Sequence, residues 1–299
     1  MYDLKKREEF ANLIGKIDFY DHKSRQVFAE KILEEVRDRV ASEDIAPLIA
    51  EVKTFPANAQ AGFKYKRGLV AHVVEPGSYV PRSRPGQTVQ LIVPMTVATA
   101  PEIELTRLES GDFESVEDLV SMAKDELIGK RTALIWNALD ASIAGSSGAL
   151  GGLNTSLFFN QADTAATKKA VLDDAITTVE DGPANVKAII GRGLAVNWIQ
   201  EIADYAETTK TERDAGMITR YRGIPIIKLK NYIDTFDQSR VGRNRLYVIG
   251  DDSIKVGFIQ ALRQLDGVDV DTATWHARIW EIYGILVLFP THNVEVEIT

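Results

Sequence analysis

The sequence predicts an α+β fold in which one long helix lies between a β-hairpin and a segment of alternating helices and strands. A helical period of apolar residues runs through 115–143. Two β-rich runs flank a stretch rich in Pro, Gly and Ser within 62–99, a pattern typical of a long hairpin. Helix and strand patterns alternate over 153–260, and β-type alternation returns over 273–298.

The composition is that of a folded protein, because 45% of the 299 residues are hydrophobic and 26% are charged. The net charge of -8 argues against a protein whose main task is to grip DNA phosphates. The absence of cysteine excludes disulfides, thiolate nucleophiles and zinc sites built on cysteine. No run reaches the roughly 20 apolar residues of a membrane helix, and the charged start is unlike a signal peptide. We therefore expect a soluble chain made in a reducing cytoplasm, with no membrane partner.

The first 50 residues are highly charged and contain one narrow apolar stripe at helical spacing. The stripe consists of Val27, Phe28, Ile32, Val36 and Val40. Such a helix buries little surface alone, so it must lie on another element. Two interpretations stay open: an ordinary amphipathic helix of the domain, or an arm that docks on a neighbouring chain.

The predicted hairpin joins a β-prone run at Leu69–Val74 to a second run at Thr88–Val93. The turn-rich stretch Pro76–Gly86 connects them and is longer than usual hairpin loops, and such length often marks a functional loop. Arg82 and Arg84 place positive charge at the tip of this loop in an acidic protein.

The long helix is predicted from Ser115 to Ile143, with Ser115 and Asp118 resembling a capping box. Gly129 interrupts the helix at a cost of about 1 kcal/mol relative to alanine. At 1.5 Å per residue the helix would be roughly 40 Å long, so we expect it to support an extended structure.

Helices and strands then alternate. The predicted helices are Lys168–Glu180 and Leu194–Tyr205, and the predicted strands are Val186–Ile190, Gly223–Ile227 and Leu246–Ile249. In the tail, Val294, Val296 and Ile298 alternate with glutamates, which predicts a half-buried strand.

Motifs for catalysis or metal binding are weak. The four histidines, His22, His72, His276 and His292, are too far apart in sequence to form a helical metal pair. The Gly145–Gly148 segment lacks the nucleophile elbow pattern and is interpreted as a flexible link.

Two glycine motifs are interpreted as turns. We interpret Gly191-Arg192-Gly193 as a tight turn that needs a positive φ. Gly250-Asp251-Asp252 resembles a metal-binding motif of viral polymerases, but a second carboxylate strand and a basic channel are missing, so we interpret it as a turn. We predict no catalytic, cofactor-binding or metal-binding residue.

The order of these parts resembles the major capsid proteins of tailed double-stranded DNA phages, which have the fold named after bacteriophage Hong Kong 97. Gly216–Ile218 leading to Gly223–Ile226 looks like a strand, turn and "G-x-P-hydrophobic" passage of that family. Leu246–Asp251 looks like its hydrophobic strand that ends in Gly-Asp. These motifs are loose, so the resemblance rests mainly on the order of the parts.

The resemblance implies a division of the chain into five parts. They are an N-terminal arm over 1–50, an extended loop with flanking strands over 51–105, a peripheral-domain spine helix over 106–149, an α/β axial domain over 150–260, and a return to peripheral strands over 261–299.

The resemblance also implies a function: a non-enzymatic major capsid protein that assembles through hexamers and pentamers into an icosahedral shell around viral double-stranded DNA. Its partners would be further copies of itself, portal and scaffolding proteins, and DNA enclosed without sequence-specific binding. We expect a virion protein assembled in the host cytoplasm without a cofactor. If a scaffold is needed, we expect it to be a separate protein, because no scaffolding segment precedes the arm. Two alternatives stay open: an encapsulin-type shell around an enzyme cargo, and an α/β metabolic enzyme with an unrecognised site.

We further hypothesise that Arg82 and Arg84 at the loop tip meet acidic residues of a neighbouring copy, namely Glu114, Glu117 or Asp118. Surface pairs of this kind contribute about 0–1 kcal/mol each, but they help to fix how two copies align.

Overall fold

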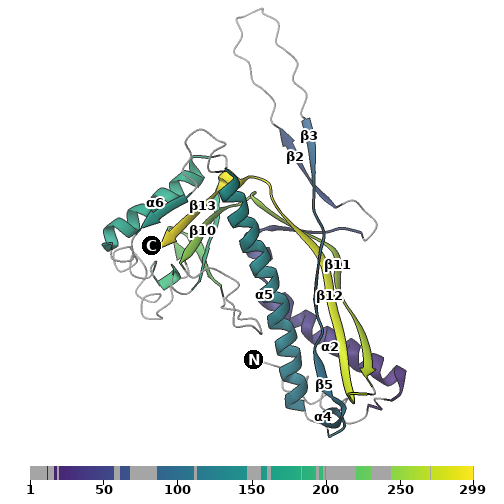
Figure 1. The fold of residues 1–299 in the computed structure, drawn as a ribbon. Helices are drawn as coiled ribbons and strands as arrows, with labels where there is room; N and C mark the ends of the chain where they lie inside the picture. Colours follow the sequence, from purple (N-terminus) through teal and green to yellow (C-terminus); the bar gives the residue numbers. More distant parts are fainter. Residues whose placement is uncertain are drawn as a thin grey trace, which may run out of the picture.

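A computed structural model gives the architecture. It describes residues 12, 17–18, 20–56, 61–67, 86–110, 113–146, 156–159, 163–182, 184–192, 195–197, 199, 220–229, 244–269 and 271–298. Within these residues the chain forms two larger sheets, one two-stranded hairpin and the helices that cover the sheets (Figure 1).

The five-stranded sheet has the order β1-β11-β12-β4, and β5 also pairs with β12. Its strands are β1 (Glu51–Thr54), β4 (Met95–Thr99), β5 (Glu102–Glu104), β11 (Ile254–Asp269) and β12 (Thr274–Val287). The six-stranded sheet has the order β6-β13-β10-β7-β9-β8. Its strands are β6 (Ser156–Phe159), β7 (Val186–Gly191), β8 (Arg220–Tyr221), β9 (Ile224–Lys228), β10 (Arg245–Gly250) and β13 (Asn293–Ile298). The described helices are α2 (His22–Glu43), α3 (Ala46–Ile49), α4 (Leu105–Glu109), α5 (Phe113–Ser146), α6 (Ala165–Glu180) and the 3-10 turn η1 (Pro290–His292).

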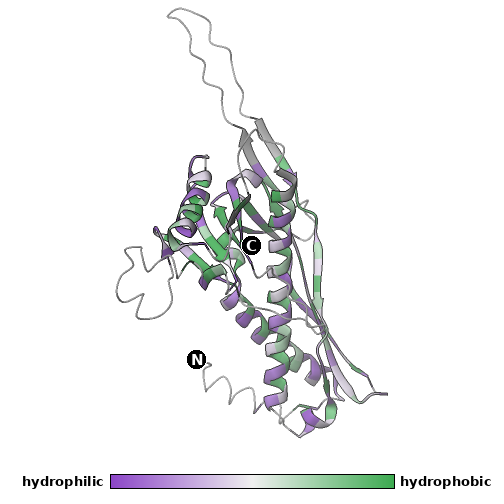
Figure 2. Ribbon diagram, turned by 60° about the vertical axis from the view of Figure 1, so that its left-hand side comes forward, coloured by the Kyte–Doolittle hydropathy of each residue, from purple (hydrophilic) through white to green (hydrophobic). Residues whose placement is uncertain are grey.

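Helix α2 packs against α5 and the long strand β11, all within one chain (Figures 1 and 2). Asp21 caps its start by accepting a hydrogen bond from the Ser24 backbone N–H. Phe28 is fully buried and meets Trp275 of β12 edge-on, with 5.1 Å between ring centroids. Of the two interpretations of the first apolar stripe, the structure therefore supports a helix of the domain, and the arm expected over 1–50 does not include α2.

Helix α5 is longer than predicted, with 34 residues and a length of roughly 51 Å. It connects the two sheets, since its buried residues join one core with both β12 and β10. In the second half of α5, Trp136 meets Tyr247 of β10 edge-on, with 4.6 Å between the ring centroids. Asp140 accepts a hydrogen bond from the Tyr247 hydroxyl and pairs with Arg245 at 3.3 Å.

The six-stranded sheet is covered on both faces, by α6 on one side and α5 on the other. The last strand, β13, lies inside this sheet between β6 and β10. The prediction of a half-buried tail strand was therefore wrong: Glu295 is only 8% exposed and pairs with Arg245 at 3.1 Å. An opposite charge on the neighbouring strand makes burial of this glutamate possible.

The chain changes sheets at points other than those expected. Strand β11 begins at Ile254 and belongs to the five-stranded sheet, so the boundary expected at residue 260 falls inside it. Strand β13 pairs with β10 of the six-stranded sheet, so the segment 261–299 does not return to one sheet as a whole. The predicted helix Leu194–Tyr205 is represented by helical residues 195–197 and 199, and its remainder lies outside the described residues.

The hairpin forms as an antiparallel pair of β2 (Gly62–Arg67) and β3 (Gly86–Leu91). Its first strand lies earlier than predicted, and the expected run Leu69–Val74 lies outside the described residues. In Figure 1 the pair projects beyond the rest of the molecule. A small separate core fixes its base, in which Phe63 and Ile92 are buried against Phe55 and residues of β11 and β12.

Glu51 links the edge strand β1 to β11 through Lys255, and its contribution to the stability of the fold should depend on pH. Hydrogen bonds from Lys255, 2.6 Å from the carboxylate, and from Lys53 hold the pKa of Glu51 below its usual range. A carboxyl with a lowered pKa stabilises the fold above its unfolded-state pKa, and this contribution is lost as the pH falls through the folded-state pKa. We expect Glu51→Gln to lower the free energy of unfolding at pH 7 and to have a smaller effect near pH ~3. Urea unfolding at both pH values checks this, with the exposed Glu109→Gln as control; an equal loss at both pH values would contradict it.

Candidate intersubunit site

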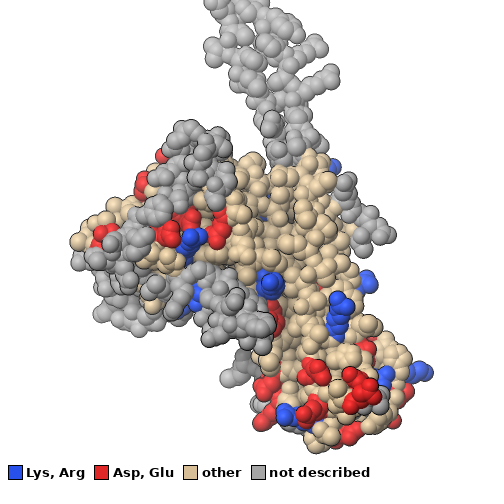
Figure 3. All heavy atoms as spheres, in the orientation of Figure 1, with Lys and Arg blue, Asp and Glu red and all other residues tan. Residues whose placement is uncertain are grey.

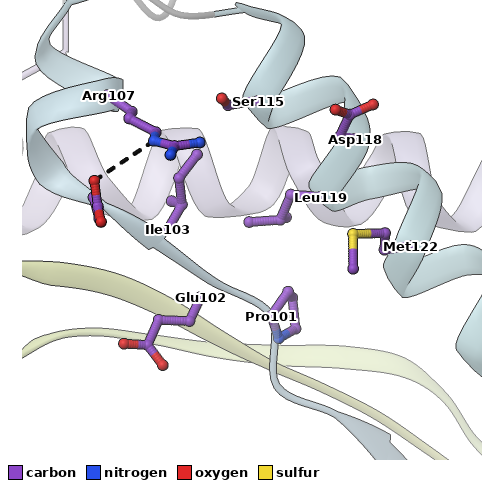
Figure 4. Close-up of a pocket in the computed structure, with 9 residues that line it drawn as sticks. Pro101, Glu102, Ile103, Arg107, Ser115, Asp118, Leu119 and Met122 are labelled. Carbon is purple, nitrogen blue, oxygen red and sulfur yellow. Dashed lines mark ion pairs between the residues drawn. The ribbon is translucent and has the colours of Figure 1, made fainter. Parts of the chain in front are cut away.

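A cavity of about 420 Å³ lies between β5, α4 and the first turns of α5 (Figure 4). It is lined by Pro101, Glu102, Ile103, Glu104, Arg107, Ser115, Asp118, Leu119 and Met122. Ile103 and Leu119 are almost buried, whereas Met122 is 68% exposed. The cavity thus combines an apolar floor with a polar rim.

The rim of this cavity is mainly acidic. Glu102, Glu104 and Asp118 contribute carboxylates, and Arg107 is the one cation among the lining residues, with its Nε 3.5 Å from Glu104 Oε2. In Figure 3 acidic side chains gather over the same lower end of the molecule. This arrangement suits a basic segment that also carries apolar side chains.

The structure separates the predicted contact residues. Asp118 lines the cavity, and Glu114 is exposed in the first turn of α5. Glu117 instead pairs with Arg39 of α2 in the same chain, with 3.8 Å between their charged atoms. Arg82 and Arg84 lie outside the described residues. Asp118 and Glu114 are thus the members of the predicted acidic set that a neighbouring copy could reach.

A second cavity of about 310 Å³ continues along the same side of the sheet, between β4 and α5. It is lined by Thr96, Val97, Ala98, Thr99, Glu126, Leu127 and Lys130. No sequence pattern predicted this groove. Its walls come from a strand and a helix that are separate in sequence, and no local pattern marks a strand as the edge of a sheet.

An ionic cluster holds the middle of α5 against β12. Arg131 of α5 is 3% exposed and Glu281 of β12 is 1% exposed, and Arg131 Nη2 lies 2.6 Å from Glu281 Oε2. Arg131 also pairs with Asp44, just after α2. Burial opposes the charged form, but the two carboxylates outweigh it and raise the pKa of the Arg131 guanidinium. Burial also raises the pKa of the nearby Tyr283 hydroxyl, so this phenol stays neutral.

The Gly250-Asp251-Asp252 motif forms a turn. Asp252 contacts the ring of His292, with 2.8 Å between Oδ1 and Nδ1. A Cβ at Gly250 would lie 2.7 Å from the His292 carbonyl oxygen, so close approach of two backbones requires glycine there. Within the part of the chain that the structure describes, no group of three or more His, Asp or Glu side chains could hold a metal ion.

The first glycine of Gly191-Arg192-Gly193 needs no positive φ, because among the described glycines only Gly223 has one. That prediction was wrong for Gly191, where a Cβ would instead lie 3.2 Å from the Leu246 Cβ. Gly193 lies outside the described residues.

Among the described helices, none is long and apolar enough to span a membrane. No protein-family model and no curated protein sequence matches the chain.

Solved structures, by contrast, match nearly the whole chain. One is a chain from Gordonia phage Cozz, with 14% identity, a TM-score of 0.62 and 86% of each chain covered. A virus-like particle from Pyrococcus furiosus matches at 13% identity and a TM-score of 0.57, covering 90% of this chain and 99% of its own. The mature capsid of bacteriophage PhiM1 matches at 10% identity and a TM-score of 0.58, covering 86% and 87%. The predicted α+β class is therefore confirmed, and the chain has the Hong Kong 97-like fold.

Proposed function

We propose that this chain is the major capsid protein of a tailed phage, a non-enzymatic structural protein that assembles through hexamers and pentamers into an icosahedral shell around double-stranded DNA. The observation that carries this proposal is the match over most of both chains to structures described as phage capsids, such as that of PhiM1. Copies of the chain are its main partners, portal and scaffolding proteins are further partners, and the assembled protein resides in the virion after assembly in the host cytoplasm.

The projecting hairpin supports this function. An isolated two-stranded sheet is marginally stable in water, and the base of β2–β3 is held by only a small core. Contacts with a neighbouring copy would supply the missing stabilisation. The acidic charge of the chain is compatible with a wall that encloses DNA and later releases it.

In this proposal the five segments named from the sequence keep their structural roles, but their residue boundaries change. The extended loop is the projecting hairpin within 51–105, and α5 is the spine helix within 106–149. The axial domain is built around the six-stranded sheet and includes β13, whereas β11 belongs to the peripheral domain.

The size of the purified protein, expressed with and without a scaffolding protein, tests the proposal. Electron microscopy and gel filtration should show shells of many copies that contain DNA when formed in infected cells. Shells with a protein cargo would favour the encapsulin-type alternative. A monomer or dimer under every condition would contradict both and favour an enzyme.

Charge reversal tests the proposed contact between the loop tip and a neighbour. We expect Arg82→Glu with Arg84→Glu to lower the fraction of protein in shells, because two glutamates would then face the acidic cavity that contains Asp118 and would be repelled by it. Adding Asp118→Arg should restore part of the yield. Sedimentation of assembled against free protein measures the fraction. Arg220→Glu with Lys228→Glu, an equal charge change at exposed positions of the six-stranded sheet, is the control. Unchanged shell yield in the loop variant would contradict the contact.

A further inference from the structure

The ionic cluster between α5 and β12 contains one more negative charge than positive charge. Arg131 is its cation, and it pairs with the carboxylates of both Glu281 and Asp44. Arg131 and Glu281 are almost fully buried, and the side chain of Asp44 is only 10% exposed. A net charge is costly to hold away from water. The cluster would lose its net charge if one of the two carboxylates took up a proton.

No second cation offsets this excess charge. Three charged or titratable groups face the Glu281 carboxylate: Arg131 of α5, Asp44 after the end of α2, and Tyr283 of β12 itself. Strand β11 contributes the ring of Phe258, which lies 5.0 Å from the guanidinium carbon of Arg131. Within the part of the chain that the structure describes, Arg131 is therefore the only cation that acts on Glu281.

Glu281 is the carboxylate that is placed to take up the proton. Burial raises the pKa of its carboxyl group, the Arg131 guanidinium lowers it and Asp44 raises it again, so that the pKa lies above its usual range. Asp44 lies at the edge of the cluster, and its Oδ1 accepts a hydrogen bond from the backbone N–H of Ala46 at 3.0 Å. Glu281 is thus the more deeply buried of the two acids and has no backbone donor in its surroundings.

The hydroxyl of Tyr283 gives the proton a second partner. Tyr283 and Glu281 are two residues apart on β12, so their side chains project from the same face of the strand. Tyr283 is fully buried, and its hydroxyl has no hydrogen-bond partner among the described residues. A buried polar atom without a partner is costly. A protonated Glu281 carries an O–H donor that this phenol oxygen can accept.

We propose that Glu281 is a proton-binding site, and that its protonation tightens the contact of α5 and the end of α2 with β12. The site lies within one chain, so the proposal does not depend on the proposed function. A carboxyl whose pKa is raised by folding keeps its proton in the folded chain at pH values where the unfolded chain has released it. The fold therefore loses stability as the pH rises through the folded-state pKa of Glu281, which is opposite to the effect expected for Glu51.

Urea unfolding of the full, unassembled chain at several pH values tests this proposal. Glu281→Gln keeps the shape of the side chain but carries no charge at any pH. A proton that only the folded chain binds changes the equilibrium constant for unfolding by up to about tenfold per pH unit. We expect the unfolding constant of the wild type, divided by that of Glu281→Gln, to be at least ~fivefold larger at pH ~8 than at pH ~5. The same ratio for the exposed Glu109→Gln should stay constant.

A second variant, Asp44→Asn, separates the excess charge from the rest of the contact. Its amide oxygen can still accept the hydrogen bond from Ala46, so the start of α3 is kept. Arg131 and Glu281 are then a balanced pair, and adding Glu281→Gln to Asp44→Asn should change the ratio less than about twofold over the same pH range.

A ratio that stays constant in the wild-type background would overturn the proton-binding site, and so would an equal pH dependence in both backgrounds. If Glu281→Gln does not fold, Asp44→Asn is compared directly with the wild type. Its unfolding constant must then rise less steeply between pH ~5 and ~8 than that of the wild type, and an equal rise would overturn the proposal.

Discussion

An Arg131→Met variant is expected to lose about 3–5 kcal/mol of the free energy of unfolding, because the substitution leaves two carboxylates without their shared cation. Glu281 is 1% exposed, so its carboxylate lies away from solvent and depends on the guanidinium for compensation. Arg131 also lies over the rings of Phe258 and Tyr283, at 5.0 and 5.6 Å from their centroids, so packing is lost with the charge. Guanidinium-induced unfolding of the unassembled chain measures the loss.

Two further variants separate charge from packing at this position. Arg131→Met combined with Glu281→Leu should recover much of the stability, since removing both members of a buried pair is far less costly than removing one. Arg131→Lys should recover little, because an ammonium group cannot reproduce the two-pronged contact with Glu281. If Arg131→Met unfolds like the wild type, the cluster does not stabilise the packing of α5 on β12.

The periodic patterns predicted several elements well. The stripe of α2, the long helix α5, helix α6 and strands β7, β9 and β10 all appear where apolar residues repeat at 3.6 or 2 residues. The 16-residue strand β11 was missed. Its register shifts at Phe258–Arg263 break the alternation, and Gly257 and Gly267 weaken the strand signal.

The candidate site was predicted only in part. Asp118 and Glu114 lie at the expected end of α5, where negative charge near a helix start is favourable. The pair between Glu117 and Arg39 depends on how α2 packs beside α5. These two helices are about 80 residues apart in the chain, and no local sequence pattern encodes their contact. The groove along β4 and β5 likewise depends on strand order, which the sequence pattern leaves open.

A Gly284→Val variant is expected to lose shell formation while its main core stays folded. Gly284 and Gly257 are paired across β12 and β11, and the chain leaving the hairpin crosses directly over them. A Cβ at Gly284 would overlap Ile92 and lie 2.6 Å from the Val93 carbonyl oxygen. The larger side chain must push the base of the hairpin away, at a cost of about 1–3 kcal/mol, and thereby redirect β2 and β3.

Hydrogen exchange of the hairpin and sedimentation of assembled protein measure the two effects of Gly284→Val. Gly267→Ala is the control on the same sheet, because its Cβ would meet only the ring of His276, the end of a movable side chain.

A second comparison tests whether contact with Ile92 and Val93 is the cause of the effect. A Cβ at Gly257 would meet the side chains of Ile92 and Phe55, so trimming Ile92 to valine should partly rescue Gly257→Ala. The same trimming should not rescue Gly284→Ala, where the Val93 backbone remains in the way. Normal assembly of Gly284→Val would contradict the expectation that these two glycines set the direction of the hairpin needed for assembly.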